Sequence, residues 1–229
     1  MNQSEQLKNQ IKEWGAAKVG YANLENVLPE AYKHLKTGIS IALRLSDEII
    51  SQITDIPTHA YFHHYRTVNT WLDQITLKTA MQLQEWGYLA MPIAASQSIN
   101  GDGYYYQGIF QHKTAATLSG IGWIGKSACL ITEEYGPRVR LGTVLTNMEA
   151  LWDESITESK CDVCNNCVKA CPALAIRGAI WNQTVTREEL FDAQACSTHM
   201  HNHYQHIGRG SVCGICIKAC PKGSKIIKR

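Results

Sequence analysis

The chain has 229 residues, of which 45% are hydrophobic and 18% are charged, enough to bury one substantial core and a second small module. Its formal net charge of +2 argues against binding nucleic acid mainly through phosphates. No stretch has the length of a membrane span, and the N-terminus lacks the apolar run of a signal peptide. We therefore expect a soluble, cytoplasmic protein without a membrane partner.

The first third of the chain predicts helices alternating with strands. Ser4 can cap a helix over residues 4–14, and a strand over residues 18–24 comes next. A half-buried strand is indicated by the alternating residues Ile39, Ile41, Leu43 and Leu45. Apolar residues at helical spacing predict the longest helix over residues 65–86, and a further strand is expected over residues 88–94.

A loop rich in Ser, Asn, Gly and Asp follows and ends in three consecutive tyrosines, Tyr104, Tyr105 and Tyr106. Loops of this composition lie at the surface and often carry function. A short helix over residues 112–119 and strands over residues 128–132 and 139–145 complete this part. The alternation predicts an α+β fold, built as an α/β sandwich.

After Trp152 hydrophobic periodicity gives way to cysteine, glycine and proline, so we expect one domain over residues 1–155 and a second over residues 156–229. In the second, Thr186 and Glu189 form a capping-box pattern, which predicts a helix running toward Cys196.

Eight cysteines of this second part follow a pattern typical of bacterial ferredoxins. The first run, C-x2-C-x2-C-x3-C-P, consists of Cys161, Cys164, Cys167, Cys171 and Pro172. Its second half is repeated by Cys213, Cys216, Cys220 and Pro221, and Cys196 lies upstream. Eight thiolates are the ligands of two 4Fe-4S clusters, and the absence of a signal peptide favours metal ligation over disulfides.

In such runs we expect the fourth cysteine to begin a helix and to bind the other cluster. The first cluster is then held by Cys161, Cys164, Cys167 and Cys220. The second is held by Cys171, Cys196, Cys213 and Cys216. A pair of zinc knuckles is the alternative, because zinc sites also use Cys-x2-Cys pairs. Three thiolates at this spacing and the Cys-Pro ending favour clusters.

Other potential ligands have simpler interpretations. Cys129 lies in an expected strand and is interpreted as a small buried hydrophobic residue, with a catalytic thiol as the alternative. His63 and His64, just before the long helix, could be ligands, proton donors or capping residues. A solvated loop, rather than a zinc or copper site, is expected for His199, His201, His203 and His206.

The segment from Gly120 to Ser127, followed by Glu134-Tyr135-Gly136, resembles the GLGWIGK signature of epoxyqueuosine reductases. The order of signature, strand and cysteine runs matches that family over about residues 60–221. Members of this family and the related reductive dehalogenases bind cobalamin, with its dimethylbenzimidazole not ligated, on a nitroreductase-like domain. One 4Fe-4S cluster lies close to the corrin. The resemblance implies the same cofactors here.

By this resemblance the signature lies beside the cofactor, with Lys126 meeting a propionamide or phosphate. The implied contacts are Gly122, Trp123, Ile124, Gly125 and Lys126. The alternative is that the glycines only make a tight turn. Arg138 and Arg140 could bind the cofactor's phosphate or an anionic substrate, or could be outward charges of a strand.

The chain departs from the family at the expected proton donor. Epoxyqueuosine reductases carry an Asp about fourteen residues before the first glycine of the signature, where this chain has Tyr106. A tyrosine can also deliver a proton, as reductive dehalogenases are thought to do, so Tyr106 is the candidate general acid. Tyr104 and Tyr105 are possible substitutes, and an aromatic wall without catalytic function is the alternative.

The chain ends at Arg229, whereas the tRNA-modifying enzymes often continue into a helical-repeat segment, so a tRNA substrate is not expected. An acidic electron donor such as ferredoxin or flavodoxin could dock on the basic residues Lys218, Lys222, Lys225, Lys228 and Arg229, although a solvated tail is the commoner meaning of such residues. The sequence thus predicts a cobalamin-dependent iron-sulfur reductase that acts on a small molecule. The alternatives are an electron carrier without a substrate, epoxyqueuosine reductase acting on tRNA, and a flavin in place of the corrin.

Overall fold

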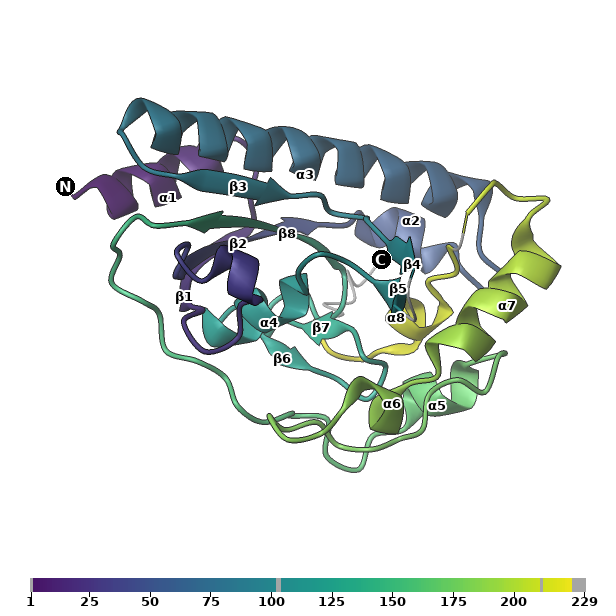
Figure 1. The fold of residues 1–229 in the computed structure, drawn as a ribbon. Helices are drawn as coiled ribbons and strands as arrows, with labels where there is room; N and C mark the ends of the chain where they lie inside the picture. Colours follow the sequence, from purple (N-terminus) through teal and green to yellow (C-terminus); the bar gives the residue numbers. More distant parts are fainter. Residues whose placement is uncertain (1, 102–103, 211, 224–229) are drawn as a thin grey trace. The chain divides into compact units, whose positions relative to one another are not determined.

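The computed structural model describes residues 2–101, 104–210 and 212–223 (Figure 1). The chain forms two compact units that interleave along the sequence. Unit 1 consists of Met1–Arg44, Val68–Ile121 and Arg140–Ile156. Unit 2 consists of Leu45–Thr67, Gly122–Val139 and Thr157–Arg229. The expected domain boundary at residue 155 lies next to Ile156, where the chain passes from unit 1 to unit 2 for the last time. Unit 2 also contains two earlier segments of the chain.

Unit 1 is built on a four-stranded sheet. In spatial order the strands are β1 (Lys18–Asn23), β2 (Thr37–Arg44), β8 (Val139–Thr146) and β3 (Ala90–Ile93). The pairs β1/β2 and β3/β8 are antiparallel, with Val19 opposite Ile41 and Ile93 opposite Thr143. The strands lie where the sequence predicts them to within a few residues.

Helices cover both faces of this sheet (Figure 1). Side chains of α1 (Gln3–Glu13), of α3 (His59–Glu85) and of one face of β2 form one core cluster, which includes Leu7, Ile41 and Leu72. On the other face, Ala115 of α4 (His112–Leu118) packs in a second cluster. The prediction that β2 is half-buried is therefore wrong, because its small residues on the second face lie beneath α4.

Two helices begin earlier than expected. Asn2, not Ser4, caps α1, since its side-chain oxygen accepts a hydrogen bond from the Glu5 N–H at 2.9 Å. Helix α3 begins at His59, where the hydroxyl of Thr58 accepts from the Tyr61 N–H at 3.1 Å. The remaining elements up to residue 131 are short: η1 (Glu30–Tyr32), α2 (Asp47–Ser51), β4 (Ile99–Gly101), β5 (Tyr104–Gln107), β6 (Trp123–Ile124) and β7 (Leu130–Ile131).

Unit 2 carries the cysteine runs on short helices. These are α5 (Asn166–Ala170), α6 (Arg187–Leu190), α7 (Ala193–Tyr204) and α8 (Ile215–Ala219). The capping box of Thr186 and Glu189 is confirmed, but its helix ends at Leu190. Asp192 then caps α7, because its carboxylate accepts from the Ala195 N–H at 2.8 Å. Most of the expected histidine loop is therefore helical, and that prediction is wrong.

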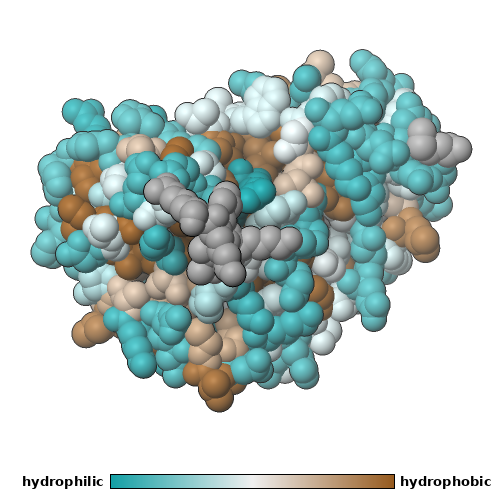
Figure 2. All heavy atoms as spheres, turned by 180° about the vertical axis from the view of Figure 1, so that it is seen from behind, coloured by the Kyte–Doolittle hydropathy of each residue, from teal (hydrophilic) through white to brown (hydrophobic). Residues whose placement is uncertain are grey.

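None of the helices in the described ranges combines the length and the hydrophobicity needed to cross a membrane. On the face shown in Figure 2, hydrophobic side chains are interspersed among hydrophilic ones.

Candidate iron-sulfur centre

The last cysteine of each run follows a short helix instead of beginning one. Cys171 caps the C-terminus of α5 and Cys220 that of α8, both in extended conformation. The prolines after them, Pro172 and Pro221, disfavour helical backbone in the preceding residue. The expectation that these cysteines begin helices is wrong for this reason.

The thiols of unit 2 interact in two groups. Cys167 interacts electrostatically with Cys161 and Cys220, and the Cys164 N–H donates to the Cys161 carbonyl at 3.1 Å. In the second group the interacting thiols are Cys171, Cys196, Cys213 and Cys216. This grouping corresponds to the crossed arrangement, and the ligation of iron by these residues stays a prediction.

Burial is the main cause of a raised pKa at two of these thiols. It raises the pKa of Cys167 to about 11 and that of Cys196 to about 12, and neighbouring thiols add to both shifts. A thiol must lose its proton to bind iron, so cluster assembly at these sites releases protons.

Cys129 does not lie in a strand or in the buried core as expected. It is partly exposed, precedes β7, and follows Ala128, whose φ is 56°. Its thiol is hydrogen-bonded to Cys216 and interacts electrostatically with Cys167 and Cys220. The ninth cysteine therefore lies among the thiols of both groups.

The glycines of the signature segment allow close approach of backbone within unit 2. A Cβ atom on Gly125 would lie 2.8 Å from Cγ1 of Ile131 and 3.3 Å from Sγ of Cys161. A Cβ on Gly122 would collide with the carbonyl oxygen of Ile131. These glycines thus permit the β6–β7 hairpin and leave room beside a cluster cysteine.

Lys126 is directed at the first cysteine run. Its side chain is buried, and its ammonium donates to the Asp162 carbonyl at 2.8 Å and to Oδ1 of Asn165 at 2.9 Å. Both acceptors lie between Cys161 and Cys167. Lys126 therefore fixes the loop that presents these cysteines.

Trp123 is buried between lysines that adjoin the same group of thiols. The ammonium of Lys160 lies 5.2 Å from the ring centroid, and that of Lys222 lies 5.9 Å from it. The indole N–H is buried without a hydrogen-bond partner in the described part of the chain. A buried donor without a partner is uncommon, and a cluster sulfur is an acceptor that would satisfy it. Its neighbour Ile124 is partly buried in β6.

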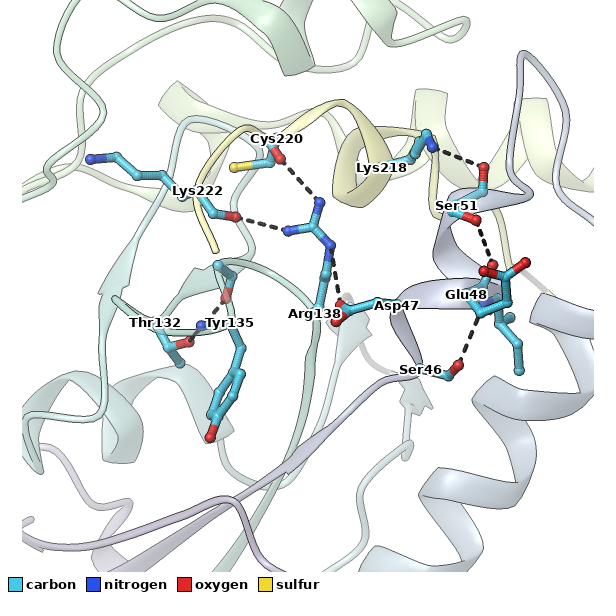
Figure 3. Close-up of polar contacts among 12 residues, drawn as sticks. Ser46, Asp47, Glu48, Ser51, Thr132, Tyr135, Arg138, Lys218, Cys220 and Lys222 are labelled. Carbon is cyan, nitrogen blue, oxygen red and sulfur yellow. Dashed lines mark hydrogen bonds and ion pairs between the residues drawn. The ribbon is translucent and has the colours of Figure 1, made fainter. Parts of the chain in front are cut away.

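Arg138 binds the backbone near Cys220, the last cysteine of the first thiol group (Figure 3). Its guanidinium donates to the carbonyl of Lys222 at 2.8 Å and to that of Cys220 at 3.3 Å. Nε lies 3.9 Å from the carboxylate of Asp47. The Arg138 side chain is therefore engaged by the segment that carries the last cysteine of the group.

These contacts decide which cofactor the residues fit. Two groups of thiols, the space at Gly125 and the unpartnered Trp123 N–H fit two iron-sulfur clusters. Lys126 and Arg138 bind protein groups, and contact of the signature segment with cobalamin stays a prediction. In unit 1, Arg140 donates to Oδ1 of Asn69 at 2.8 Å and to the Ala95 carbonyl at 3.3 Å.

Tyr106 lies on β5 of unit 1, and its side chain is 45% exposed. Its φ of 58° is in the left-handed region, which is costly for a bulky residue. Such strain often marks a functional position. The side chains of Tyr104 and Tyr105 lie outside the described part of the structure, as do Lys225, Lys228 and Arg229.

Two histidines have identifiable structural roles. His64 lies within α3, and its Nε2 accepts from the Ser46 N–H at 3.0 Å. In unit 1, Nε2 of His112 lies 2.9 Å from the Ala94 carbonyl, and Nδ1 lies 2.9 Å from the Thr143 hydroxyl. A carbonyl only accepts, so Nε2 of His112 carries the proton. Burial lowers the pKa of His112, and Arg140 lowers it further against the opposing effect of the Ala94 carbonyl.

This lowered pKa predicts a pH dependence of stability. The unfolding free energy should fall as the pH drops below about 6.5, because the unfolded chain then binds a proton that folded His112 resists. Above that pH, His112 does not change the dependence of the unfolding free energy on pH. We expect the substitution His112→Gln to flatten the acidic limb, measured by urea unfolding between about pH 5 and pH 8. Parallel curves for the two proteins would contradict this assignment.

The histidines of α7 do not form a metal site in the described ranges, where no three His, Cys, Asp or Glu side chains converge on a single-ion position. His199 and His203 stack one helical turn apart, with ring centroids separated by 4.4 Å.

Comparison with known proteins identifies the relatives of this chain. Residues 160–223 match the family model of the 4Fe-4S double cluster binding domain. The epoxyqueuosine reductase of Gloeobacter violaceus is 33% identical over 126 residues, which cover 52% of this chain and 37% of that protein. The tetrachloroethene reductive dehalogenase of Sulfurospirillum multivorans is 30% identical over 140 residues, covering 55% and 27%.

Solved structures show the same fold at low sequence identity. A structure reported to suggest a mechanism for B12-dependent dehalogenation superposes with a TM-score of 0.76 at 18% identity, covering 95% of this chain and 31% of that one. Epoxyqueuosine reductase from Streptococcus thermophilus gives 0.61 at 18% identity, covering 97% and 66%.

The chain therefore spans well under half the length of the two curated relatives described. The resemblance inferred from the signature and the cysteine runs is confirmed by both sequence and fold. This protein is a relative of the epoxyqueuosine reductases and the reductive dehalogenases, and it contains a 4Fe-4S double cluster binding domain.

Proposed function

We propose that the chain is an iron-sulfur oxidoreductase in which two 4Fe-4S clusters pass electrons to an acceptor held by unit 1. The observation that carries this proposal is the match of residues 160–223, which contain eight cysteines at ferredoxin-like spacing, to a double cluster domain. Closely placed clusters conduct single electrons, and reductase relatives use them for that purpose. A low-potential donor such as ferredoxin or flavodoxin is the proposed source of electrons.

For the acceptor we propose cobalamin, on a nitroreductase-like unit 1, with a small molecule as the final substrate. The support is the similarity to a structure described as B12-dependent. When bound, a corrin supplies a cobalt that can be reduced to a strong nucleophile or electron donor. The residues proposed to lie beside the corrin are Gly122, Trp123, Ile124, Gly125 and Lys126 of the signature segment, together with Arg138 and Arg140.

Tyr106 is the proposed general acid of this reaction. Its phenol is substantially exposed, and its backbone conformation is one that a tyrosine rarely adopts. A phenol can donate a proton to a substrate that has received electrons.

Epoxyqueuosine reduction on tRNA is the second candidate. Its support is the superposition on epoxyqueuosine reductase over 97% of this chain. Binding to a tRNA stem loop that weakens as salt concentration rises would favour this substrate over a small molecule.

The deciding experiment is anaerobic reconstitution with iron and sulfide in the presence of cobalamin, followed by metal analysis and an optical spectrum. About eight irons and one cobalt per chain, with the corrin band of a base-off species, are expected. Eight irons without cobalt uptake would favour an electron carrier, and a released yellow flavin would replace cobalamin as the acceptor. Zinc without iron would refute the proposed function.

A further inference from the structure

Within the described ranges, two charged side chains are buried, and both lie in the segment between residues 122 and 139 of unit 2. Lys126 is 5% exposed and Arg138 is 6% exposed. They reach different ends of the same thiol group. Lys126 contacts the loop between Cys161 and Cys167, and Arg138 contacts the carbonyl of Cys220.

Both hydrogen-bond partners of the Lys126 ammonium are neutral, one a backbone carbonyl and the other a side-chain amide. Burying an ammonium among neutral groups is costly unless a negative charge lies nearby. A 4Fe-4S cluster with four thiolate ligands carries a net negative charge. The first cluster would therefore provide the charge that stabilises buried Lys126.

Arg138 binds the backbone at Cys220, the last cysteine of the same thiol group (Figure 3). Its two carbonyl acceptors belong to Cys220 and Lys222, and the carboxylate of Asp47 at 3.9 Å neutralises part of its charge. The guanidinium is therefore fixed against the backbone of a cysteine of the first group, where water cannot fully screen its charge.

The second group has a different electrostatic environment. The carboxylate of Asp192 lies four residues before Cys196 and caps the helix that contains this cysteine, so the nearest fixed charge there is negative. Lys218, close in sequence to Cys216, is exposed, and its ammonium donates to the Ser51 carbonyl at 2.8 Å. Water screens such an exposed charge far more than it screens a buried one.

We propose that Lys126 and Arg138 are positioning residues that raise the reduction potential of the first cluster, held by Cys161, Cys164, Cys167 and Cys220, above that of the second. Reduction adds one electron to the cluster, and a fixed positive charge in a poorly solvated environment stabilises that electron. A single electron entering from the donor therefore resides on the first cluster. This inference rests on the two clusters of the proposed function and does not depend on cobalamin.

The test is an anaerobic redox titration of the reconstituted full chain, followed by electron paramagnetic resonance. In Lys126→Met we expect the higher of the two midpoint potentials to fall and the lower to stay unchanged. At the wild-type midpoint, the ratio of reduced to oxidised first cluster should fall about tenfold, which corresponds to 59 mV for one electron. Arg138→Met should shift the same signal by less, because Asp47 already offsets part of that charge.

Matched variants separate charge from packing. Lys126→Arg retains the charge and should retain the potential. Lys160→Met removes a lysine next to Cys161 whose side chain is 60% exposed, and it should leave both potentials unchanged. Cys167→Ala should abolish the higher-potential signal, and loss of the lower-potential signal instead would overturn the proposal.

Iron and sulfide analysis precedes each titration. A wild-type chain that binds no clusters refutes the proposed function, whereas full iron with the same potentials in Lys126→Met and Arg138→Met overturns this inference alone. If Lys126→Met binds less iron, the decision rests on Arg138→Lys against Arg138→Met. Equal potentials in that pair would show that the Arg138 charge has no effect and would overturn the proposal.

Discussion

The variant Cys220→Ala is expected to bind about half the iron of the wild-type chain and to keep one intact cluster. Cys220 interacts with Cys161 and Cys167, and its segment is held by Arg138. Loss of one thiolate leaves three ligands at the first cluster, while the second group is unchanged. Iron and sulfide analysis with low-temperature electron paramagnetic resonance measures the result.

The matched control is Cys129→Ala, which removes the ninth cysteine and should retain all the iron. Cys161→Ala should leave the same surviving spectrum as Cys220→Ala, whereas Cys171→Ala should leave the other one. If Cys161→Ala and Cys171→Ala leave identical spectra, the crossed arrangement is wrong.

The substitution Gly136→Ala should destabilise unit 2 by about 4 kcal/mol, combining left-handed strain with overpacking. Gly136 has a φ of +56°, and an added Cβ would collide with the carbonyl of Lys222. Relief of this collision would displace the backbone that follows Cys220, so iron should be lost from the first cluster. Urea unfolding and iron content measure the two effects.

Gly178→Ala is the control for backbone strain without collision. Gly178 also lies in unit 2 and has a φ of +82°, but its Cβ would come no closer than 3.7 Å to Cγ2 of Val168. It should cost about 1 kcal/mol and retain full iron. A loss of stability as large as that of Gly136→Ala would show that collision with Lys222 is not the cause.

The strands of unit 1 were predicted well from the sequence. The alternating residues and the turn residues that mark a strand lie within a few positions of each other, so a short stretch of sequence contains the whole signal. These local patterns missed the burial of β2, whose second face consists of Gly38, Ser40 and Ala42. Small residues there look like a solvated face until α4 is known to cover them. The early start of α3 was also missed, although Thr58 ahead of Tyr61 is a capping signal that the sequence contains.

The cluster cysteines were found because their spacing is itself the signal, and the comparisons support the domain that they define. The hydrogen-bond acceptors of Lys126 and Arg138 were not predicted, because they lie 39 and 84 positions away in the sequence. Nothing local in the sequence indicates that these two side chains bind the cysteine segments.

The interleaving of the two units has a consequence for recombination and protein engineering. A fragment that begins at residue 157 keeps all eight expected cluster cysteines, yet it lacks the segments Leu45–Thr67 and Gly122–Val139 that belong to the same unit. Such a fragment has neither Lys126 nor Arg138, and the backbone after Cys220 no longer rests on Gly136. The expected cluster-binding part therefore cannot be transferred to another protein as one continuous segment. A transfer would have to include all three segments of unit 2.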